Sequence, residues 1–165
     1  MIDNLIKKQR SLLLNKSFYP LFWVQFLGAF NDNLFKNAMV IFITFKLTNS
    51  AADTGLLITL AAGLFILPFF IFSAFAGQLS DHYPKSDLIK KIKLAEIFIM
   101  FLGGLALISQ NLWLLFITLF LMGSQSAFFG PIKYSILPEI LDDKHLIKGN
   151  GLFSGSTFIA ILLGS

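Results

Sequence analysis

The sequence has no cysteine and carries little charge. The absence of cysteine excludes disulfides, thiol catalysis and cysteine-ligated metal sites, and it leaves the redox compartment undetermined. Charged residues make up 13% of the chain and hydrophobic residues 56%. An average soluble domain has about 25% and about 45–50%. A water-soluble fold of this composition would leave apolar surface uncovered, so the composition favours a membrane protein.

Histidine is also scarce. The two histidines, His82 and His145, lie in separate segments that we expect to be loops, so the sequence supports neither a catalytic pair nor a metal site. We therefore expect no enzyme, no cofactor and no metal in this chain. The net charge of +4 comes from short basic clusters between apolar stretches, so nucleic acid is not an expected partner.

Long apolar stretches alternate with short polar ones along the chain. About 20 apolar residues in a helix cross the ~30 Å of a bilayer's hydrocarbon. We therefore expect an all-α, polytopic transmembrane helix bundle in a lipid bilayer, with a kink at Pro68. A basic arm is expected at about 1–19. Five spans follow, at about 20–47, 54–79, 92–108, 112–130 and 150–165.

Because 150–165 is shorter than a full span, we expect that span to be incomplete and the chain to be the N-terminal part of a longer protein. A short interfacial helix is expected in the mixed-charge segment before it. The basic residues indicate an orientation. Of thirteen Lys and Arg, eleven lie in the arm, the 80–93 segment or the 131–149 segment. Basic residues concentrate in cytoplasmic loops, so the N-terminus is predicted to be cytoplasmic.

A polar break interrupts the first expected span. It consists of Asn31, Asp32, Asn33, Lys36 and Asn37. Each charge costs roughly 2.5–3.5 kcal/mol at the middle of a membrane, so such a segment usually faces a cavity, a partner helix or a substrate. At about 100° per residue, Asp32 and Lys36 share one helix face with Gln25, with Asn33 and Asn37 beside it and Asn31 elsewhere.

Two interpretations of this face remain open. In the first, it lines a substrate or coupling-ion path, where Asp32 meets a cation or an ammonium group and Lys36 a phosphate or carboxylate. In the second, these two residues, at positions i and i+4, neutralise each other or pair with a neighbouring helix. Glu96, at the entry of the third span, is a second candidate acid for the path. Its alternative role is an ion pair with Lys93 or Lys133.

A further candidate stretch, Gly77 to Lys85, closes the second span. We expect Gly77 to allow close approach of helices, and Asp81 and Lys85 to lie in a tight cytoplasmic turn that is either a gating loop or simply solvated. The stretch resembles the signature between helices two and three of the major facilitator superfamily. There the aspartate helps to latch the cytoplasmic side closed, a role that the resemblance gives to Asp81. His82 and Pro84 depart from the usual pattern.

Three other stretches, 30–37, 85–96 and 128–139, together resemble the bacterial lysophospholipid transporter family, and the likeness continues into 149–164. That family includes inner-membrane flippases and the transporter halves of fusions to an acyltransferase and an acyl-carrier-protein synthetase. The resemblance implies the N-terminal half of a transporter that moves lysophospholipid by alternating access, with further helices of its own fold as partners. Relatives generally carry an acid where this chain has Ser154.

The substrate that the resemblance implies suits the composition. A lysophospholipid needs an apolar wall for one acyl chain and a few polar groups for its head, and an aromatic-rich bundle with one polar stripe offers both. Lys133, in the expected cytoplasmic loop, either reaches toward the lipid headgroups or marks the cytoplasmic side. The alternatives are a drug or small-metabolite exporter of the same superfamily and an inactive, truncated remnant.

Overall fold

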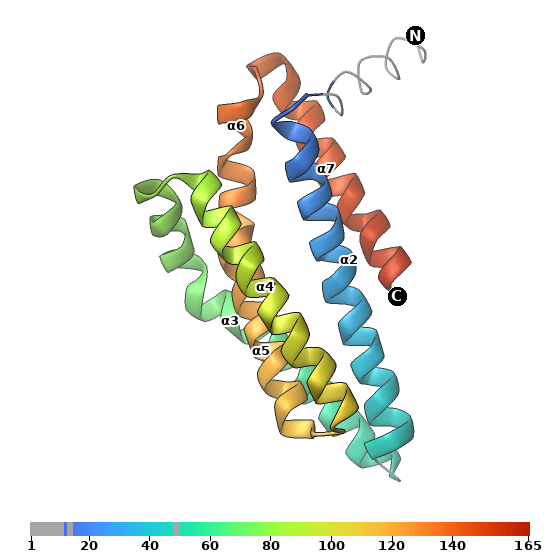
Figure 1. Cartoon of the computed structure of the whole chain (residues 1–165). Coiled ribbons are helices and arrows are strands. Elements are labelled where there is room, and N and C mark those ends of the chain that lie inside the picture. The colour runs from blue at the N-terminus through green and yellow to red at the C-terminus, as the bar shows by residue number, and fades with distance from the viewer. Residues whose placement is uncertain (1–11, 13–14, 48–49) are drawn as a thin grey trace. The chain divides into compact units, whose positions relative to one another are not determined.

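The computed structural model describes residues 12, 15–47 and 50–165 of the chain, and these residues form helices without a strand among them (Figure 1). This confirms the all-α fold class. Most of the basic arm expected at 1–19 lies outside the described residues, as does part of the turn after the first span. The elements in order are α2 (Phe18–Phe42), the π-helix η1 (Ile43–Leu47), α3 (Ala51–His82), α4 (Lys85–Ile108), α5 (Leu112–Ser135), α6 (Leu137–Ile140) and α7 (Asp143–Gly164).

Helices α3 and α4 extend further toward each other in sequence than the expected spans. The segment around His82, expected to be a loop, is mostly helical: α3 continues to His82 and α4 begins at Lys85, so that only Tyr83 and Pro84 connect them. Polar side chains are compatible with helix ends, where they remain exposed to water. Asp87 in the first turn of α4 also interacts favourably with the positive end of the helix dipole.

The C-terminal helices differ from expectation in the same way. Helix α5 continues through Pro131 to Ser135, so Lys133 lies in its last turn, where a cation is favourable, and not in a loop. The short helix expected before the last span is confirmed as α6. Helix α7 begins at Asp143 and has 22 residues, so the expected start near residue 150 is wrong and the helix is long enough to cross a membrane.

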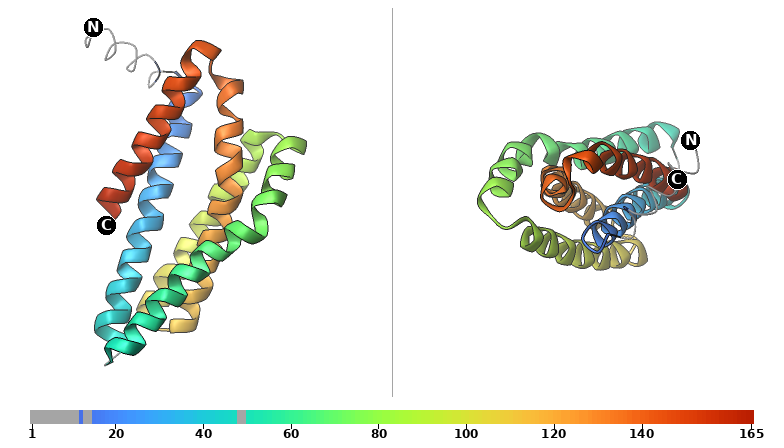
Figure 2. Two further views of the ribbon diagram at one scale, coloured as in Figure 1. Left: turned by 180° about the vertical axis from the view of Figure 1, so that it is seen from behind. Right: turned by 90° about the horizontal axis from the view of Figure 1, so that it is seen from above.

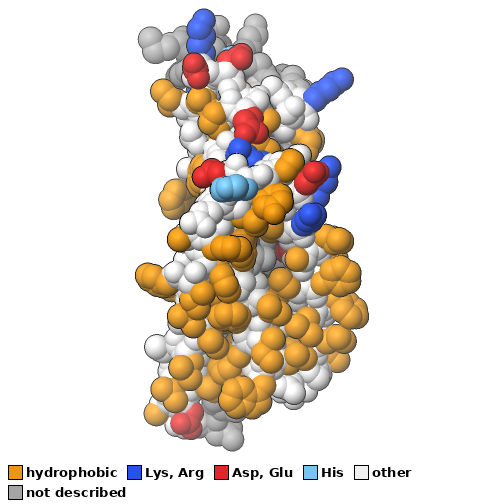
Figure 3. Space-filling model, turned by 90° about the vertical axis from the view of Figure 1, so that its left-hand side faces the viewer, with side chains coloured by type: hydrophobic (Ala, Val, Ile, Leu, Met, Phe, Trp, Pro, Cys, Tyr) orange, Lys and Arg blue, Asp and Glu red, His pale blue; other side chains and the backbone are white. Residues whose placement is uncertain are grey.

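Among the described residues, three helices, α3, α5 and α7, are both long and apolar enough to span a membrane. Helix α2 carries the polar break in its middle, and α4 has several lysines in its first turns. Large apolar side chains nevertheless face outward, such as Phe70 on α3 with 82% of its surface exposed and Phe101 on α4 with 69%. Hydrophobic side chains cover most of the face in Figure 3, whereas charged ones gather toward one end of it. This distribution supports a membrane-spanning bundle.

The chain divides into two compact units, residues 1–34 with 133–165 and residues 35–132. In the first unit, α7 lies beside the N-terminal part of α2 (Figures 1 and 2). The rings of Phe18 and Phe153 pack with centroids 5.4 Å apart. At the other end of α7, a Cβ added to Gly164 would lie 2.8 Å from the carbonyl oxygen of Phe30. Glycine therefore lets these two helices approach closely.

The second unit contains the buried apolar core, which α2, η1, α3, α4 and α5 share. Helix α5 meets α3 at Gly123, where a Cβ would collide with the carbonyl oxygen of Phe65 and crowd the ring of Pro68. Helix α3 contains this proline in its interior and changes direction along its length (Figure 2), as the missing hydrogen bond predicts. The core residues are Phe35, Met39, Ile43, Ala61, Ala106, Leu115, Leu119 and Met122.

Candidate functional site

The polar break lies within one uninterrupted helix, α2, as its periodicity required. All five polar side chains of the break, residues 31–33, 36 and 37, are half-buried. The amide of Asn33 donates a hydrogen bond to the carbonyl oxygen of Ala29 at 2.7 Å, one turn earlier. Apolar residues on both sides continue the helix, and the polar side chains are accommodated without breaking it. Asp32 falls in the first compact unit and Lys36 in the second.

In the first unit, Gln25 links α2 to α7. Its side chain is 3% exposed, and its Nε2 donates a hydrogen bond to Oγ1 of Thr157 at 2.7 Å. The Thr157 hydroxyl in turn donates to the carbonyl oxygen of Phe153 at 2.8 Å. Hydrogen bonds of this kind hold neighbouring membrane helices together. The partner was not evident from the sequence, because Thr157 is distant in the chain.

In the second unit, the Nζ of Lys36 lies 4.4 Å from the ring centroid of Phe65 on α3. This is a cation–π contact. Beside this contact is a cavity of about 260 Å³ that Lys36 helps to line. Sequence reasoning missed the cavity, because its apolar lining is indistinguishable from lipid-facing or core residues. The lining consists of Lys36, Met39 and Val40 from α2, Ile58, Ala61, Ala62, Phe65 and Ile66 from α3, and Leu119 from α5.

Glu96 on α4 forms an ion pair with Lys93 on the same helix, with 2.5 Å between Oε2 and Nζ. The side chains of Glu96 and Lys93 are only 11% and 20% exposed. The ammonium group also lies 4.3 Å from the ring centroid of Phe129 on α5. The structure thus confirms the ion pair with Lys93 that the sequence offered as the alternative role of Glu96. Its part in a substrate path stays a prediction.

One buried polar side chain near this pair was missed. Gln125 on α5 is 6% exposed and lies one turn before Phe129. Its Nε2 donates a hydrogen bond to Oγ of Ser126 at 2.9 Å, while its Oε1 has no hydrogen-bond partner among the described residues. The signal in the sequence was a glutamine within an otherwise apolar helix.

The expected gating loop is corrected in one respect. Gly77 and Asp81 both lie in α3, and Lys85 is the first residue of α4, so none of them is in a loop. No described atom comes within 4 Å of a Cβ placed on Gly77, so a close approach at this glycine stays a prediction. Close approach occurs at Gly123. Asp81 is exposed, and its role as a latch stays a prediction.

The remaining candidates are peripheral. Lys133 is half-buried, with its Nζ 5.1 Å from the ring centroid of Tyr134. Ser154, where an acid was expected from the resemblance, is exposed on α7. Within the part of the chain that the structure describes, no three histidine, aspartate or glutamate side chains come together in a way that could hold a metal ion.

Comparison with known proteins gives a consistent set of relatives. The family model of the Major Facilitator Superfamily matches residues 21–165. The lysophospholipid transporter LplT of Serratia proteamaculans is 30% identical over 158 residues, which are 94% of this chain and 36% of that protein. The lysophospholipid transporters LplT of Photorhabdus laumondii and Escherichia coli are each 31% identical over 93% of this chain. No solved structure matches. The chain spans about a third of the length of these curated relatives, 36% in each case.

Proposed function

We propose that this chain, which belongs to the Major Facilitator Superfamily, forms part of a lysophospholipid transporter of the bacterial inner membrane. Proteins of this name in three bacteria are about 30% identical to almost its whole length. Transport proceeds by alternating access, in which two helix bundles rock about a site near the middle of the membrane. The chain contributes one bundle, and further helices of the same fold are its partner.

The observation that carries this proposal is the half-buried polar face in the middle of an otherwise apolar helix, α2. A lysophospholipid has a polar head with a phosphate and a single acyl chain. Asp32 is the group that addresses an ammonium or a coupling cation, and Lys36 the group that addresses the phosphate. Asn31, Asn33 and Asn37 supply neutral hydrogen-bonding groups along the same stretch. Polar groups at this depth are costly and mark substrate or ion pathways.

The other candidate residues have supporting roles in the proposal. Gln25 holds α2 against α7 through Thr157, which fixes the helix that carries the polar face. Glu96, paired with Lys93, is the second acid near the path. Asp81 latches the cytoplasmic side with Gly77 and Lys85 around it, and Lys133 marks that side. The positions and charges of these residues support the roles.

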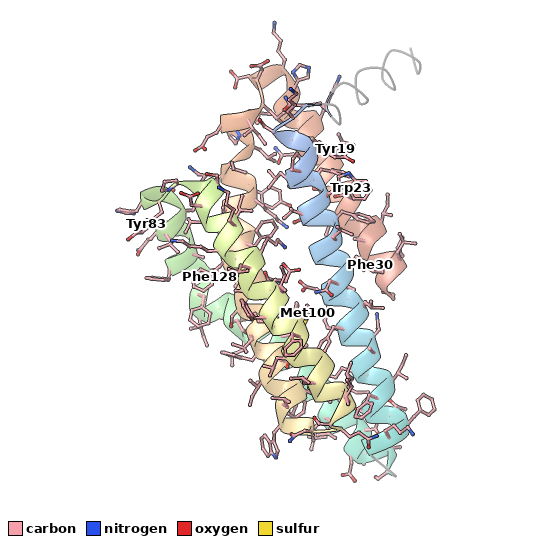
Figure 4. The ribbon with its side chains drawn as sticks, viewed as in Figure 1. Tyr19, Trp23, Phe30, Tyr83, Met100 and Phe128 are labelled. Carbon is pink, nitrogen blue, oxygen red and sulfur yellow. The ribbon has the colours of Figure 1, made fainter. Side chains whose placement is uncertain are left out.

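The proposal places the N-terminus in the cytoplasm. The basic clusters favour that orientation. The start of α2 supports a membrane interface at this level: Tyr19 and Trp23, labelled in Figure 4, are 49% and 41% exposed, with ring centroids 6.2 Å apart. Exposed tyrosine and tryptophan are enriched where a helix passes from headgroups into hydrocarbon.

Uptake of labelled lysophosphatidylethanolamine tests the proposal. Cells that produce the protein carrying this sequence are expected to internalise the lipid faster than cells with an empty vector. A parallel assay with fluorescent drug substrates tests the exporter alternative. Uptake of the lipid at the empty-vector level, from cells with confirmed membrane insertion of the protein, would overturn the proposal.

A further inference from the structure

We propose that Glu96 on α4 is a proton-binding site, in which the protonated carboxyl group donates a hydrogen bond to Oε1 of Gln125 on α5. In the ionised state, the carboxylate instead pairs with Lys93 on its own helix, as the structure shows. The ligand is a proton and not the lipid, so the site goes beyond the proposed function and can be tested without substrate. Its three side chains all lie within the second compact unit.

Helices α4 and α5 run beside each other in opposite directions (Figure 1), and two contacts between them define their register. A Cβ added to Gly103 on α4 would lie 3.1 Å from Cγ2 of Thr118 on α5. About three turns away, Nζ of Lys93 on α4 lies 4.3 Å from the ring centroid of Phe129 on α5. The two contacts are nearly the same distance apart along both helices, so the residues between them face each other level by level.

Glu96 and Gln125 lie at one level of this contact. Glu96 follows Lys93 by about one turn of α4, and Gln125 precedes Phe129 by about one turn of α5. Because the helices are antiparallel, both steps lead in the same direction along the bundle. Residues three or four apart share a helix face, so both side chains stay on the faces that carry the contact between Lys93 and Phe129. Glu96 and Gln125 are only 9% and 6% exposed.

The hydrogen-bonding groups of these two side chains match in the protonated state. Nε2 of Gln125 donates to Oγ of Ser126 at 2.9 Å, and its buried Oε1 has no hydrogen-bond partner in the described part of the chain. An ionised carboxylate and an amide oxygen are both acceptors, so they cannot bond to each other. A protonated carboxyl group has an O–H donor, which Oε1 of Gln125 can accept.

Two partners therefore serve the two forms of Glu96. The Lys93 ammonium group donates to Oε2 of the ionised form at 2.5 Å, and it is the charged group that contacts Glu96 among the described residues. From α5, the facing side chains are the neutral Gln125 and the ring of Phe129. Proton uptake from water adds one hydrogen to a carboxylate oxygen, exchanges the ion pair for the new hydrogen bond and leaves Lys93 charged beside that ring. The hydrogen bond between α4 and α5 thus forms in acid and is lost when the proton leaves.

Infrared titration of the purified protein in lipid nanodiscs tests the site. Glutamate labelled with ¹³C separates the bands of glutamate carboxyl groups from those of aspartate. As the pH falls, we expect a band of a protonated glutamate whose carbonyl frequency is lowered by donation of a hydrogen bond. Glu96→Gln is expected to remove this band, whereas Glu139→Gln, at the exposed glutamate of α6, keeps it. Absence of the band in the unaltered protein, down to the pH at which it unfolds, would overturn the site.

Gln125→Leu tests the hydrogen bond itself. The band is expected to move to higher frequency, and its titration midpoint to fall by roughly one pH unit, a tenfold loss of proton affinity. A more apolar environment alone would favour the neutral acid and raise the midpoint, so the direction separates the two effects. The matched control Gln78→Leu, at an exposed glutamine of α3, leaves the frequency and the midpoint unchanged. An unchanged band or a raised midpoint in Gln125→Leu would contradict the bond to Oε1.

Lys93→Met gives a second assignment that leaves the glutamate in place. Its midpoint is expected to rise, because the carboxylate loses the ammonium group that stabilises it. The site therefore remains testable if Glu96→Gln does not fold. A band that neither Lys93→Met nor Gln125→Leu alters belongs to another carboxyl group and overturns the site. Lipid uptake is measured in a separate assay, so failure of the proton site and failure of the transport proposal are distinguished.

Discussion

Lys36 on α2 and Lys93 on α4 both place an ammonium group over a phenylalanine ring, at 4.4 Å and 4.3 Å from the centroid. Their other neighbours differ. Lys93 has the carboxylate of Glu96 at 2.5 Å, and both side chains of that pair are largely buried. Lys36 lies in the wall of an apolar cavity of about 260 Å³. Lys93 is thus enclosed with a countercharge from its own helix, and Lys36 borders an apolar cavity.

The difference separates two uses of charge in an apolar helix. In an enclosed ion pair, the attraction between the two charges offsets part of the cost of removing them from water, so the pair contributes to the stability of the fold. A well-packed apolar pair can contribute as much. A charge at a cavity wall is placed to meet a ligand of opposite sign. The ion pair supports a structural role for Lys93 and Glu96, whereas substrate binding by the α2 face is a proposal, and the following changes are designed to test that division.

Glu96→Ala is expected to have the largest effect on stability. It leaves the Lys93 ammonium buried without its carboxylate, which typically costs roughly 3–5 kcal/mol. Thermal unfolding of the purified protein in detergent measures the loss. Replacing both residues, as Lys93→Met with Glu96→Leu, is expected to recover most of it, because no charge is then left alone. A single mutant that unfolds like the parent protein would remove the structural assignment of the pair.

Gly123→Ala is expected to have an intermediate effect. The added methyl group would meet backbone atoms of Phe65, which cannot move aside as a side chain can, so α3 and α5 must separate. Overpacking of this kind costs roughly 1–3 kcal/mol. The matched change Gly77→Ala, where no described atom lies within 4 Å of the new Cβ, is expected to be neutral or to stabilise the helix by up to ~1 kcal/mol. Equal unfolding temperatures for the two variants would contradict the packing assigned to Gly123.

Gln25→Leu is expected to have the smallest effect. It removes the neutral hydrogen bond to Thr157 between α2 and α7, and such bonds in membranes are worth about 0.6 kcal/mol on average. Thr157→Val is expected to cost a similar amount, and the double variant no more than either alone. Additive losses in thermal unfolding would show that the two residues act through different partners.

Much of the fold was predictable because apolar length and helix type are local properties. The all-α class, the helical register of Gln25, Asp32 and Lys36, and the Lys93 partner of Glu96 all depend on residues within a few turns of each other. Helix ends were predicted less well. Asp81 and Lys85 were expected in a turn, although helix ends accommodate polar side chains as readily as loops do.

The parts that depend on contacts between helices could not be predicted. The cavity beside Lys36 arises from the packing of α2, α3 and α5, and no pattern within one helix indicates an unfilled volume. A close helix contact was expected at Gly77 because small residues permit it, whereas the structure places one at Gly123. A glycine in a membrane helix permits close approach, but only the neighbouring helix determines whether the approach occurs.

The most direct test of the central claim is uptake of lysophosphatidylethanolamine by cells that produce the Asp32→Asn variant, normalised to the amount of inserted protein. If the polar face of α2 addresses substrate, uptake falls to the empty-vector level while insertion stays near normal. The double variant Asp32→Asn with Lys36→Ala then inserts no better than either single variant. If insertion is lost instead, and the double variant inserts better than both, the two charges mainly neutralise each other and the substrate assignment is contradicted.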